Sequence, residues 1–135
     1  MKIYIAAKYH RRHDLRGVVS ILVEAGHEVT SRWISDGEGQ AGLADLYAAQ
    51  DLDDVAEADV LLFIGEQQGS KNTGGGRWFE FGVAFNSGKR CMAVLGGVGD
   101  NTNLGACAPG HESVFTSLPS IEVFNSIDEA IVALG

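Results

Sequence analysis

The sequence predicts an α/β domain with a doubly wound, five-stranded parallel sheet. Short β-rich runs alternate along the chain with longer segments of helical periodicity. This alternation is typical of a parallel sheet that is covered by helices on both faces and joined by right-handed crossovers. The chain has 135 residues, of which 45% are hydrophobic, enough for one core but not for a second domain. We therefore expect a single domain over residues 1–135.

The expected strands are short and apolar, and comprise residues 2–6, 27–31, 59–64, 91–95 and 121–124. The longest apolar run, residues 60–64, is far shorter than the ~18 residues that suggest a membrane span. Met1 continues directly into the first strand without the pattern of a signal peptide. We therefore expect a soluble, cytoplasmic protein that does not bind membranes.

Helical patterns fill the intervals between and after the strands, at residues 13–25, 42–58, 77–88 and 127–134, with a short turn near 112–117. Gly26 occupies the position of a glycine that ends a helix. Ser126, followed three residues later by Glu129, forms a capping box for the last helix. These local signals agree with a flavodoxin-like or Rossmann-like arrangement.

The charge of the chain argues against a nucleic-acid polymer as partner. A formal net charge of −8 is opposite to the broad basic surface that binds phosphate backbones. The basic side chains are nevertheless concentrated between residues 8 and 16, so a small anion remains a possible ligand. Cys91 and Cys107 have no metal-site spacing, and we expect a packed Cys91, an incidental Cys107, and neither metal nor cofactor.

Ligands of doubly wound sheets lie beyond the carboxyl ends of the strands, where the winding reverses. The loops expected there are residues 7–12, 32–42, 65–76 and 96–110. The last two are long and rich in glycine, which is typical of loops that bind something or move, although plain surface loops are the alternative.

Glu80 is out of place in its helix. Residues 77–88 are apolar almost all the way round, which is typical of a buried helix, and Glu80 shares one side of it with Val83 and Ala84. A buried charge needs a partner or a function. The helix dipole favours the ionised form that a carboxylate nucleophile requires, whereas a structural ion pair with Arg77 is the alternative.

Asp51 is the second anomaly. On a helical wheel of residues 42–58 it lies inside the apolar arc beside Tyr47, whereas Asp54 lies only at the edge of that arc. If this helix and the one carrying Glu80 flank the third strand, two carboxyl groups converge as a nucleophile and a proton donor.

The segment AAKYHRR, residues 6–12, is the third feature of interest. It follows the first strand directly, where main-chain N–H groups and basic side chains suit an anion, although the same side chains could simply solubilise the start of a helix.

These segments, in this order, resemble the nucleoside 2-deoxyribosyltransferase family, including relatives that hydrolyse 2′-deoxynucleoside 5′-monophosphates. The matching blocks are KIYIAAKYHRR, AAQDLDDVAEADVLLFI and GGGRWFEFGVAFNSGKRCMAVLG, and the resemblance covers essentially the whole chain. The resemblance implies that Glu80 attacks C1′ and forms a glycosyl ester. It implies that Asp51 helps to protonate the departing base and that Tyr9 orients the nucleophile.

One departure from the family separates its branches. Transferases usually carry an aspartate about six residues before the nucleophile, where this chain has Gly74. The glycine-rich loop resembles the monophosphate-hydrolysing branch, in which main-chain N–H groups, hydroxyls and cations hold a 5′-phosphate. The residues expected to bind substrate are Ala7, Lys8, Arg11, Arg12, Ser70, Gly74, Gly75, Gly76 and Arg77.

The leading hypothesis is therefore an N-glycosidase acting on a nucleoside or nucleotide. The alternatives are a base-exchanging transferase and a non-catalytic nucleotide-binding or sensor domain. We further expect a homodimer or larger homo-oligomer, because the family is usually oligomeric and because Trp33, Trp78 and Phe85 add bulky apolar surface.

Overall fold

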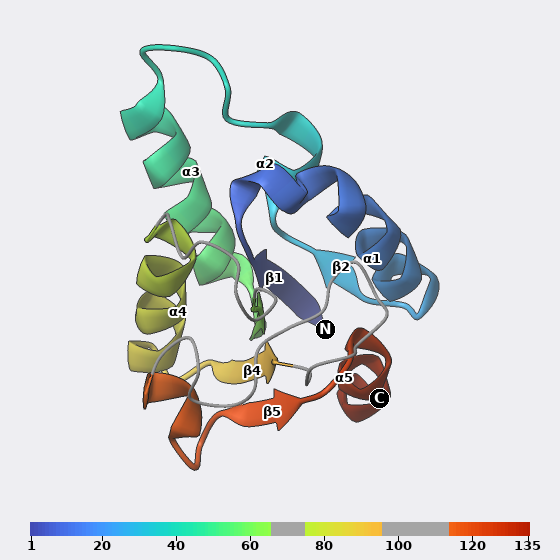
Figure 1. Ribbon diagram of the computed structural model, residues 1–135. Coiled ribbons are helices and arrows are strands. Elements are labelled where there is room, and N and C mark those ends of the chain that lie inside the picture. Colours follow the sequence, from blue (N-terminus) through green and yellow to red (C-terminus); the bar gives the residue numbers. More distant parts are fainter. Residues whose placement is uncertain (66–74, 96–113) are drawn as a thin grey trace.

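Five parallel strands form the sheet of the computed structural model, which describes residues 1–65, 75–95 and 114–135 (Figure 1). The order in the sheet is β2-β1-β3-β4-β5, and every neighbouring pair is parallel. The winding therefore reverses between β1 and β3, and the doubly wound sheet expected from the sequence is confirmed. The strands are β1 (Lys2–Ala6), β2 (Glu28–Val29), β3 (Val60–Ile64), β4 (Arg90–Val94) and β5 (Glu122–Phe124).

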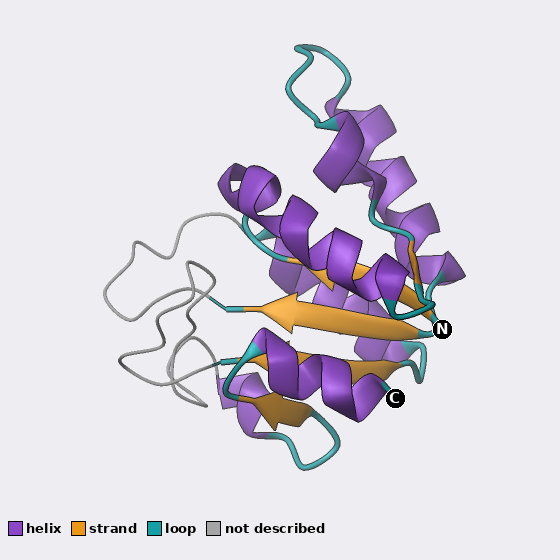
Figure 2. Cartoon of the chain, turned by 90° about the vertical axis from the view of Figure 1, so that its right-hand side faces the viewer, coloured by secondary structure: helices purple, strands orange, loops and turns teal. Residues whose placement is uncertain are grey.

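Helices cover both faces of this sheet. In Figure 1, α3 and α4 lie together on one side of it and α1 and α5 lie on the other. The strands all run in one direction, and the two ends of the chain lie near the amino-terminal ends of the strands (Figure 2). The helices are α1 (Arg12–Glu24), α2 (Arg32–Asp36), α3 (Ala44–Glu57), α4 (Gly76–Asn86) and α5 (Ile127–Leu134), with 3-10 turns η1 (Tyr9–Arg11) and η2 (Val114–Ser117).

Two short elements were not expected from the sequence. The turn η1 and the five-residue helix α2 lie in segments predicted as loops. Helical periodicity cannot reveal elements of one turn or so, because the pattern needs several turns to repeat. The Nε1 of Trp33, in α2, donates a hydrogen bond to the carbonyl oxygen of Ile5 at 3.1 Å, which places α2 against β1.

The core lies between the sheet and its helices. Every residue of β3 is buried, as is Cys91 of β4, in agreement with the sequence analysis. Trp33 is only 4% exposed, so its assignment to an exposed apolar surface was wrong. Trp78 is half-buried, whereas Phe85 is 42% exposed as expected, and Phe79, which the sequence analysis did not name, is 63% exposed. Self-association remains a prediction. Cys107 lies outside the described residues.

The helix ends agree with their sequence signals. Gly26 follows α1 with φ +92°, a conformation that favours glycine. Ser126 Oγ accepts a hydrogen bond from the main-chain N–H of Glu129 at 3.2 Å. The carboxylate of Glu129 reaches back to the N–H of Asn125 at 3.0 Å, one residue before the position expected for a capping box. None of the helices in the described part of the chain is long and apolar enough to cross a membrane.

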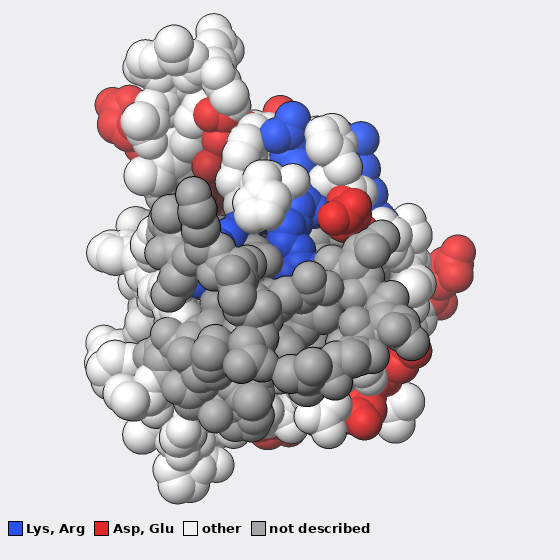
Figure 3. Space-filling view, viewed as in Figure 1, with Lys and Arg blue, Asp and Glu red and all other residues white. Residues whose placement is uncertain are grey.

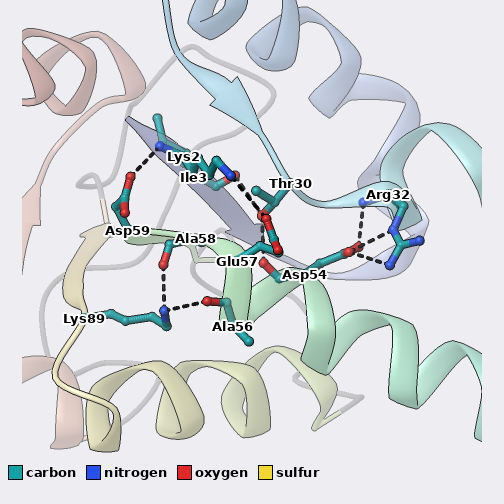
Figure 4. A network of polar contacts seen from close by, with 10 residues as sticks. All are labelled: Lys2, Ile3, Thr30, Arg32, Asp54, Ala56, Glu57, Ala58, Asp59 and Lys89. Carbon is teal, nitrogen blue, oxygen red and sulfur yellow. Dashed lines mark hydrogen bonds and ion pairs between the residues drawn. The ribbon is translucent and has the colours of Figure 1, made fainter.

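Asp54 of α3 is more buried than its place on the helical wheel predicted. It is 4% exposed, and its Oδ1 accepts a hydrogen bond from Arg32 Nε at 2.8 Å (Figure 4). Its Oδ2 accepts from the main-chain N–H of Arg32 at 3.0 Å, and its carbonyl oxygen accepts from Thr30 Oγ1 at 2.8 Å. These partners come from the segment around α2, so the periodicity of α3 alone could not indicate them.

The C-terminal end of α3 is held from a second side. Lys89 Nζ donates hydrogen bonds to the carbonyl oxygens of Ala56 and Ala58 at 3.0 and 2.7 Å (Figure 4). The main-chain N–H of Lys2 donates to the carboxylate of Asp59 at 2.9 Å. Carbonyl groups at a helix end otherwise lack partners, and the Lys89 contacts supply them. The contact between Lys2 and Asp59 links the end of α3 to β1.

We predict that Asp54→Ala lowers the free energy of unfolding by about 2 kcal/mol, because it removes the acceptor of several buried or half-buried donors. Asp53→Ala, which removes an exposed carboxylate from the same helix, should change it by less than ~0.5 kcal/mol. Urea denaturation of both variants measures the difference. Equal losses would contradict the role assigned to this ion pair.

Candidate active site

A pocket of about 420 Å³ opens between the segment that follows β1, the region of α2, and the helices α3 and α4. It lies beside the point where the winding of the sheet reverses, the position at which such sheets bind ligands. Glu80 and Asp51 both line it, as the convergence of α3 and α4 on β3 predicted. Its lining residues are Ala7, Lys8, Tyr9, His10, Trp33, Glu38, Asp51, Gly76, Arg77 and Glu80.

An aromatic cluster fixes α4 on the sheet and thereby places Glu80. The ring of Phe63, in β3, lies 4.5 Å from that of Trp78 and 5.3 Å from that of Phe81, measured between centroids. Such tilted and edge-to-face pairs contribute beyond the burial of apolar area. Glu80 lies between the two α4 aromatics in sequence, and its side chain reaches the pocket.

Glu80 accepts a hydrogen bond from the hydroxyl of Tyr4, with 2.7 Å between Tyr4 Oη and Glu80 Oε2. Tyr4 lies in β1 and is fully buried. Burial raises the pKa of Glu80, the Tyr4 hydroxyl lowers it and the charge of Glu38 raises it, leaving a pKa of about 7. Burial and the neighbouring carboxyl groups raise the pKa of Tyr4 as well, so the hydroxyl keeps its proton and remains the donor.

An ion pair with Arg77 was the alternative explanation for a buried Glu80. In the described part of the structure Glu80 instead has a hydrogen bond from Tyr4, and burial is the largest cause of its raised pKa. The guanidinium of Arg77 lies 5.6 Å from the ring centre of Phe63 and 5.4 Å from that of Trp78. Arg77 is 3% exposed and lines the pocket together with Glu80.

Asp51 has a higher pKa than Glu80. Burial first, then hydrogen bonding with the carboxyl group of Glu38 and the charges of Glu38 and Glu80, raise the pKa of Asp51 to about 9. Asp51 Oδ1 and Glu38 Oε1 are buried and accept no hydrogen bond from the donors in the described part of the structure. Asp51 is therefore protonated at neutral pH, when Glu80 is close to half ionised.

Tyr9 lines the pocket but does not make the contact that the family resemblance implied. The tyrosine that donates to Glu80 is Tyr4, whereas the hydroxyl of Tyr9 accepts a hydrogen bond from the main-chain N–H of Glu38 at 2.7 Å. The two tyrosines lie in different elements: Tyr4 lies in β1, from which its hydroxyl reaches Glu80, and Tyr9 lies in the turn η1, from which its hydroxyl reaches Glu38. A role for Tyr9 towards substrate remains a prediction.

The basic segment after β1 divides into different environments. Lys8 is 8% exposed and lines the pocket. Arg11 is buried and its Nη1 donates to the carbonyl oxygen of Gly65 at 2.9 Å, and the guanidinium of Arg12 lies 4.6 Å from the ring centre of Tyr9. Lys and Arg side chains gather where η1 and α1 begin, with Asp and Glu side chains to the side of α3 (Figure 3).

Gly75 and Gly76, two further residues predicted to bind substrate, lie at the start of α4. Gly76 lines the main pocket, and Gly75 and Gly76 line an adjoining hollow that also contains Asp51 and Glu80. Ser70 and Gly74 lie outside the described residues. Arg11 and Arg12 are absent from the described lining of the main pocket, so direct contact of these two with substrate stays a prediction.

The sequence analysis missed Tyr4 and Glu38. Tyr4 is in a strand that is buried throughout, so its polar group was not marked by any alternation. Glu38 lies in the segment that follows α2, without a periodic pattern. A tyrosine in an otherwise aliphatic strand was the available signal for the first, because a buried hydroxyl needs a partner.

No family model matches the sequence, and no curated protein gives a significant match. Solved structures do match over nearly the whole chain. A CMP N-glycosidase, BcmB, from Clostridium botulinum is 19% identical, with 99% of this chain and 97% of that chain covered and a TM-score of 0.61. A 2-deoxyribosyltransferase from Bacillus psychrosaccharolyticus is 20% identical, with coverages of 97% and 90% and a TM-score of 0.66.

A conserved protein from Enterococcus faecalis V583 is 18% identical, with coverages of 98% and 95% and a TM-score of 0.63. At such identities the likeness concerns the fold. The chain therefore has the fold of a CMP N-glycosidase and of a 2-deoxyribosyltransferase, the fold implied by its resemblance to the nucleoside 2-deoxyribosyltransferase family.

Proposed function

We propose that the protein cleaves the N-glycosidic bond of a nucleoside or nucleoside 5′-monophosphate and releases the free base, with Glu80 as nucleophile. The observation that carries this proposal is the pair formed by Glu80, held by Tyr4 and ionisable near neutral pH, and the protonated Asp51 in the same pocket. Two carboxyl groups whose pKa values are pushed apart are suited to act as nucleophile and acid. The activities of the two named structural neighbours support the same chemistry.

The reaction proceeds in two steps. The Glu80 carboxylate attacks C1′ and forms an ester, while the C1′–N bond breaks and its electron pair goes to the base, which receives the proton of Asp51. The ionised Asp51 then takes a proton from water as that water attacks C1′, which frees Glu80 and the sugar. Two displacements at C1′ give net retention of configuration, as in retaining glycosidases.

Tyr4 prepares Glu80 for the first step. Its hydrogen bond holds the carboxylate in one orientation and opposes the effect of burial on the pKa of Glu80. As charge leaves the carboxylate during ester formation, the same hydroxyl remains a donor to the ester oxygen. Tyr4 is thus a positioning residue whose removal should impair chemistry more than binding.

We predict that Glu80→Gln abolishes turnover and stabilises the fold at pH 8. An amide cannot form the ester, so kcat should fall by at least ~10³-fold. The folded-state pKa of Glu80, about 7, exceeds its ordinary value of 4.5, so its ionisation costs stability as pH rises through 7. The Tm of Glu80→Gln at pH 8 should therefore exceed that of the wild type by roughly 3 °C or more.

Product chromatography and thermal denaturation measure the two effects. Glu57→Gln, which changes an exposed glutamate on α3, is the matched control and should leave both unchanged. Near-normal turnover in Glu80→Gln would show that the nucleophile is misassigned.

We predict a bell-shaped pH dependence of kcat/KM. Glu80 acts in its ionised form, so the rate should rise through pH ~7, and Asp51 acts in its protonated form, so the rate should fall through pH ~9. Tyr4→Phe removes a donor that lowers the pKa of Glu80, so the rising limb should move to higher pH. Asp51→Asn should reduce activity and remove the falling limb. A rising limb unaffected by Tyr4→Phe would contradict the assignment of Glu80 to it.

We predict a preference for 5′-monophosphates over free nucleosides. Lys8 and Arg77 line the pocket, and charge-assisted hydrogen bonds to phosphate contribute ~1.5–3 kcal/mol each, enough for a hundredfold preference after desolvation. Because the protein carries a net charge of −8, salt should weaken monophosphate binding markedly. The comparison is kcat/KM for a deoxynucleoside and its monophosphate at two salt concentrations.

Lys8→Met should reduce the preference, whereas Lys2→Met, which removes an exposed lysine paired with Glu57, should not. Equal use of both substrates by the wild type would favour the base-exchanging transferase, and turnover increased by a free acceptor base would identify it.

A further inference from the structure

Glu38 is a carboxylate of the pocket that the proposed mechanism does not use. It follows Gly37, whose φ of +75° favours glycine and whose added Cβ would lie 3.2 Å from Tyr9 Oη. The main-chain N–H of Glu38 donates to that same hydroxyl at 2.7 Å. The position of Glu38 is therefore determined by Tyr9 and Gly37 rather than by its own side chain.

Glu38 and Asp51 form a pair of carboxyl groups in the pocket wall. Both residues line the pocket, and one oxygen of each is buried without a donor among the described residues. The raised pKa of Asp51 keeps the proton on that side chain at neutral pH, and hydrogen bonding with Glu38 contributes to this shift. The pair thus offers a ligand an acidic proton on Asp51 and an accepting oxygen on Glu38.

The aromatic side chain of Tyr9 suits a nucleobase. Tyr9 is half-buried and lines the pocket, and Trp33, only 4% exposed, packs beside it with ring centroids 6.2 Å apart and planes tilted by 39°. Aromatic faces stack on bases of any kind and do not distinguish one from another. Discrimination between bases therefore falls to polar groups of the pocket, of which Glu38, Asp51 and the proposed nucleophile Glu80 are acidic.

We propose that Glu38, acting with Asp51, selects bases that carry an amino group next to a basic ring nitrogen, such as cytosine and adenine, over their oxo counterparts. This inference rests on the function proposed above and names the substrate class for that site. Glu38 is then a specificity-determining residue that accepts a hydrogen bond from the amino group, while Asp51 delivers its proton to the ring nitrogen.

The proton balance favours amino bases. In cytosine and adenine nucleotides the ring nitrogen beside the amino group has a free lone pair, so it can take the Asp51 proton before the C1′–N bond breaks. The base is then cationic and leaves as a neutral molecule when it takes the bond's electron pair. Glu38 and Glu80 stabilise that cation.

Oxo bases lack this route. In uracil and hypoxanthine the corresponding ring nitrogen already carries a proton, so Asp51 cannot protonate the base at that edge. In uracil the remaining sites are oxygens, and in hypoxanthine the ring nitrogens with a free lone pair, N3 and N7, lie away from that edge. The N–H of such a base then meets the protonated Asp51, leaving a donor opposite a donor. A site that hydrogen-bonds one edge rejects an analogue whose donors and acceptors differ, because polar groups are left unpaired.

Binding tests this inference without turnover. In the Glu80→Gln background, calorimetric titration compares the deoxynucleoside 5′-monophosphates of cytosine with uracil and of adenine with hypoxanthine. We expect each amino compound to bind at least ~10-fold more tightly than its oxo counterpart. Adding Glu38→Gln should bring both ratios close to 1, whereas adding Glu57→Gln should leave them unchanged.

The ratio of the affinities for the amino and the oxo compound distinguishes base recognition by Glu38 from a purely structural role. If Glu38 merely supported the fold, its replacement would weaken both members of a pair equally and preserve the ratio, which would overturn the inference. Equal binding of both members in the Glu80→Gln background, or no binding of any, would overturn it as well. Adding Glu38→Asp, which keeps the charge on a shorter side chain, should retain part of the preference, provided that thermal denaturation shows a folded protein.

Turnover by the wild type separates this inference from the proposed function. A preference for amino bases in binding, with no release of base from any nucleoside or nucleotide, would refute the proposed cleavage and leave the recognition by Glu38 standing. Release of base with equal kcat/KM for amino and oxo substrates would refute the recognition and leave the cleavage standing.

Discussion

The hydrogen bond from Tyr4 to Glu80 determines what the pocket can do. Burial alone favours a neutral carboxyl group, which cannot attack carbon. The Tyr4 hydroxyl, fixed in the buried strand β1, opposes this effect and leaves the pKa of Glu80 at about 7. The aromatic contacts that hold α4 on β3 and the ordered core around β1 are needed to keep this donor and acceptor 2.7 Å apart.

The same low dielectric also raises the pKa of Asp51, and it does so further than for Glu80 because the neighbour of Asp51 is different. Asp51 faces another carboxyl group, Glu38, rather than a hydroxyl donor, and its pKa rises to about 9. Two chemically similar side chains thereby differ in protonation at pH 8. The difference comes from one tyrosine and one glutamate supplied by segments far from both in sequence, β1 and the segment after α2.

The sequence predicted the features that depend on periodicity within one element. The alternation of strands and helices indicated the parallel sheet, and helical spacing turned Asp51 and Glu80 inwards. It could not predict contacts between elements. The burial of Asp54 depends on Arg32, and the donor to Glu80 is Tyr4, in a strand buried on both faces that gives no alternation to read. Family resemblance implied a tyrosine near the nucleophile but led to Tyr9 rather than Tyr4.

Electrostatics also link phosphate binding to the chemistry. A phosphate dianion near Glu80 would raise the pKa of that carboxyl group further and reduce the ionised fraction that the proposed mechanism requires. Lys8 and Arg77, which line the same pocket, would limit this effect by pairing with the phosphate and neutralising much of its charge. Cations that bind the phosphate would therefore also preserve the ionised form of the proposed nucleophile. Their removal should lower kcat for monophosphates as well as affinity, since binding and ionisation share one small, poorly screened volume.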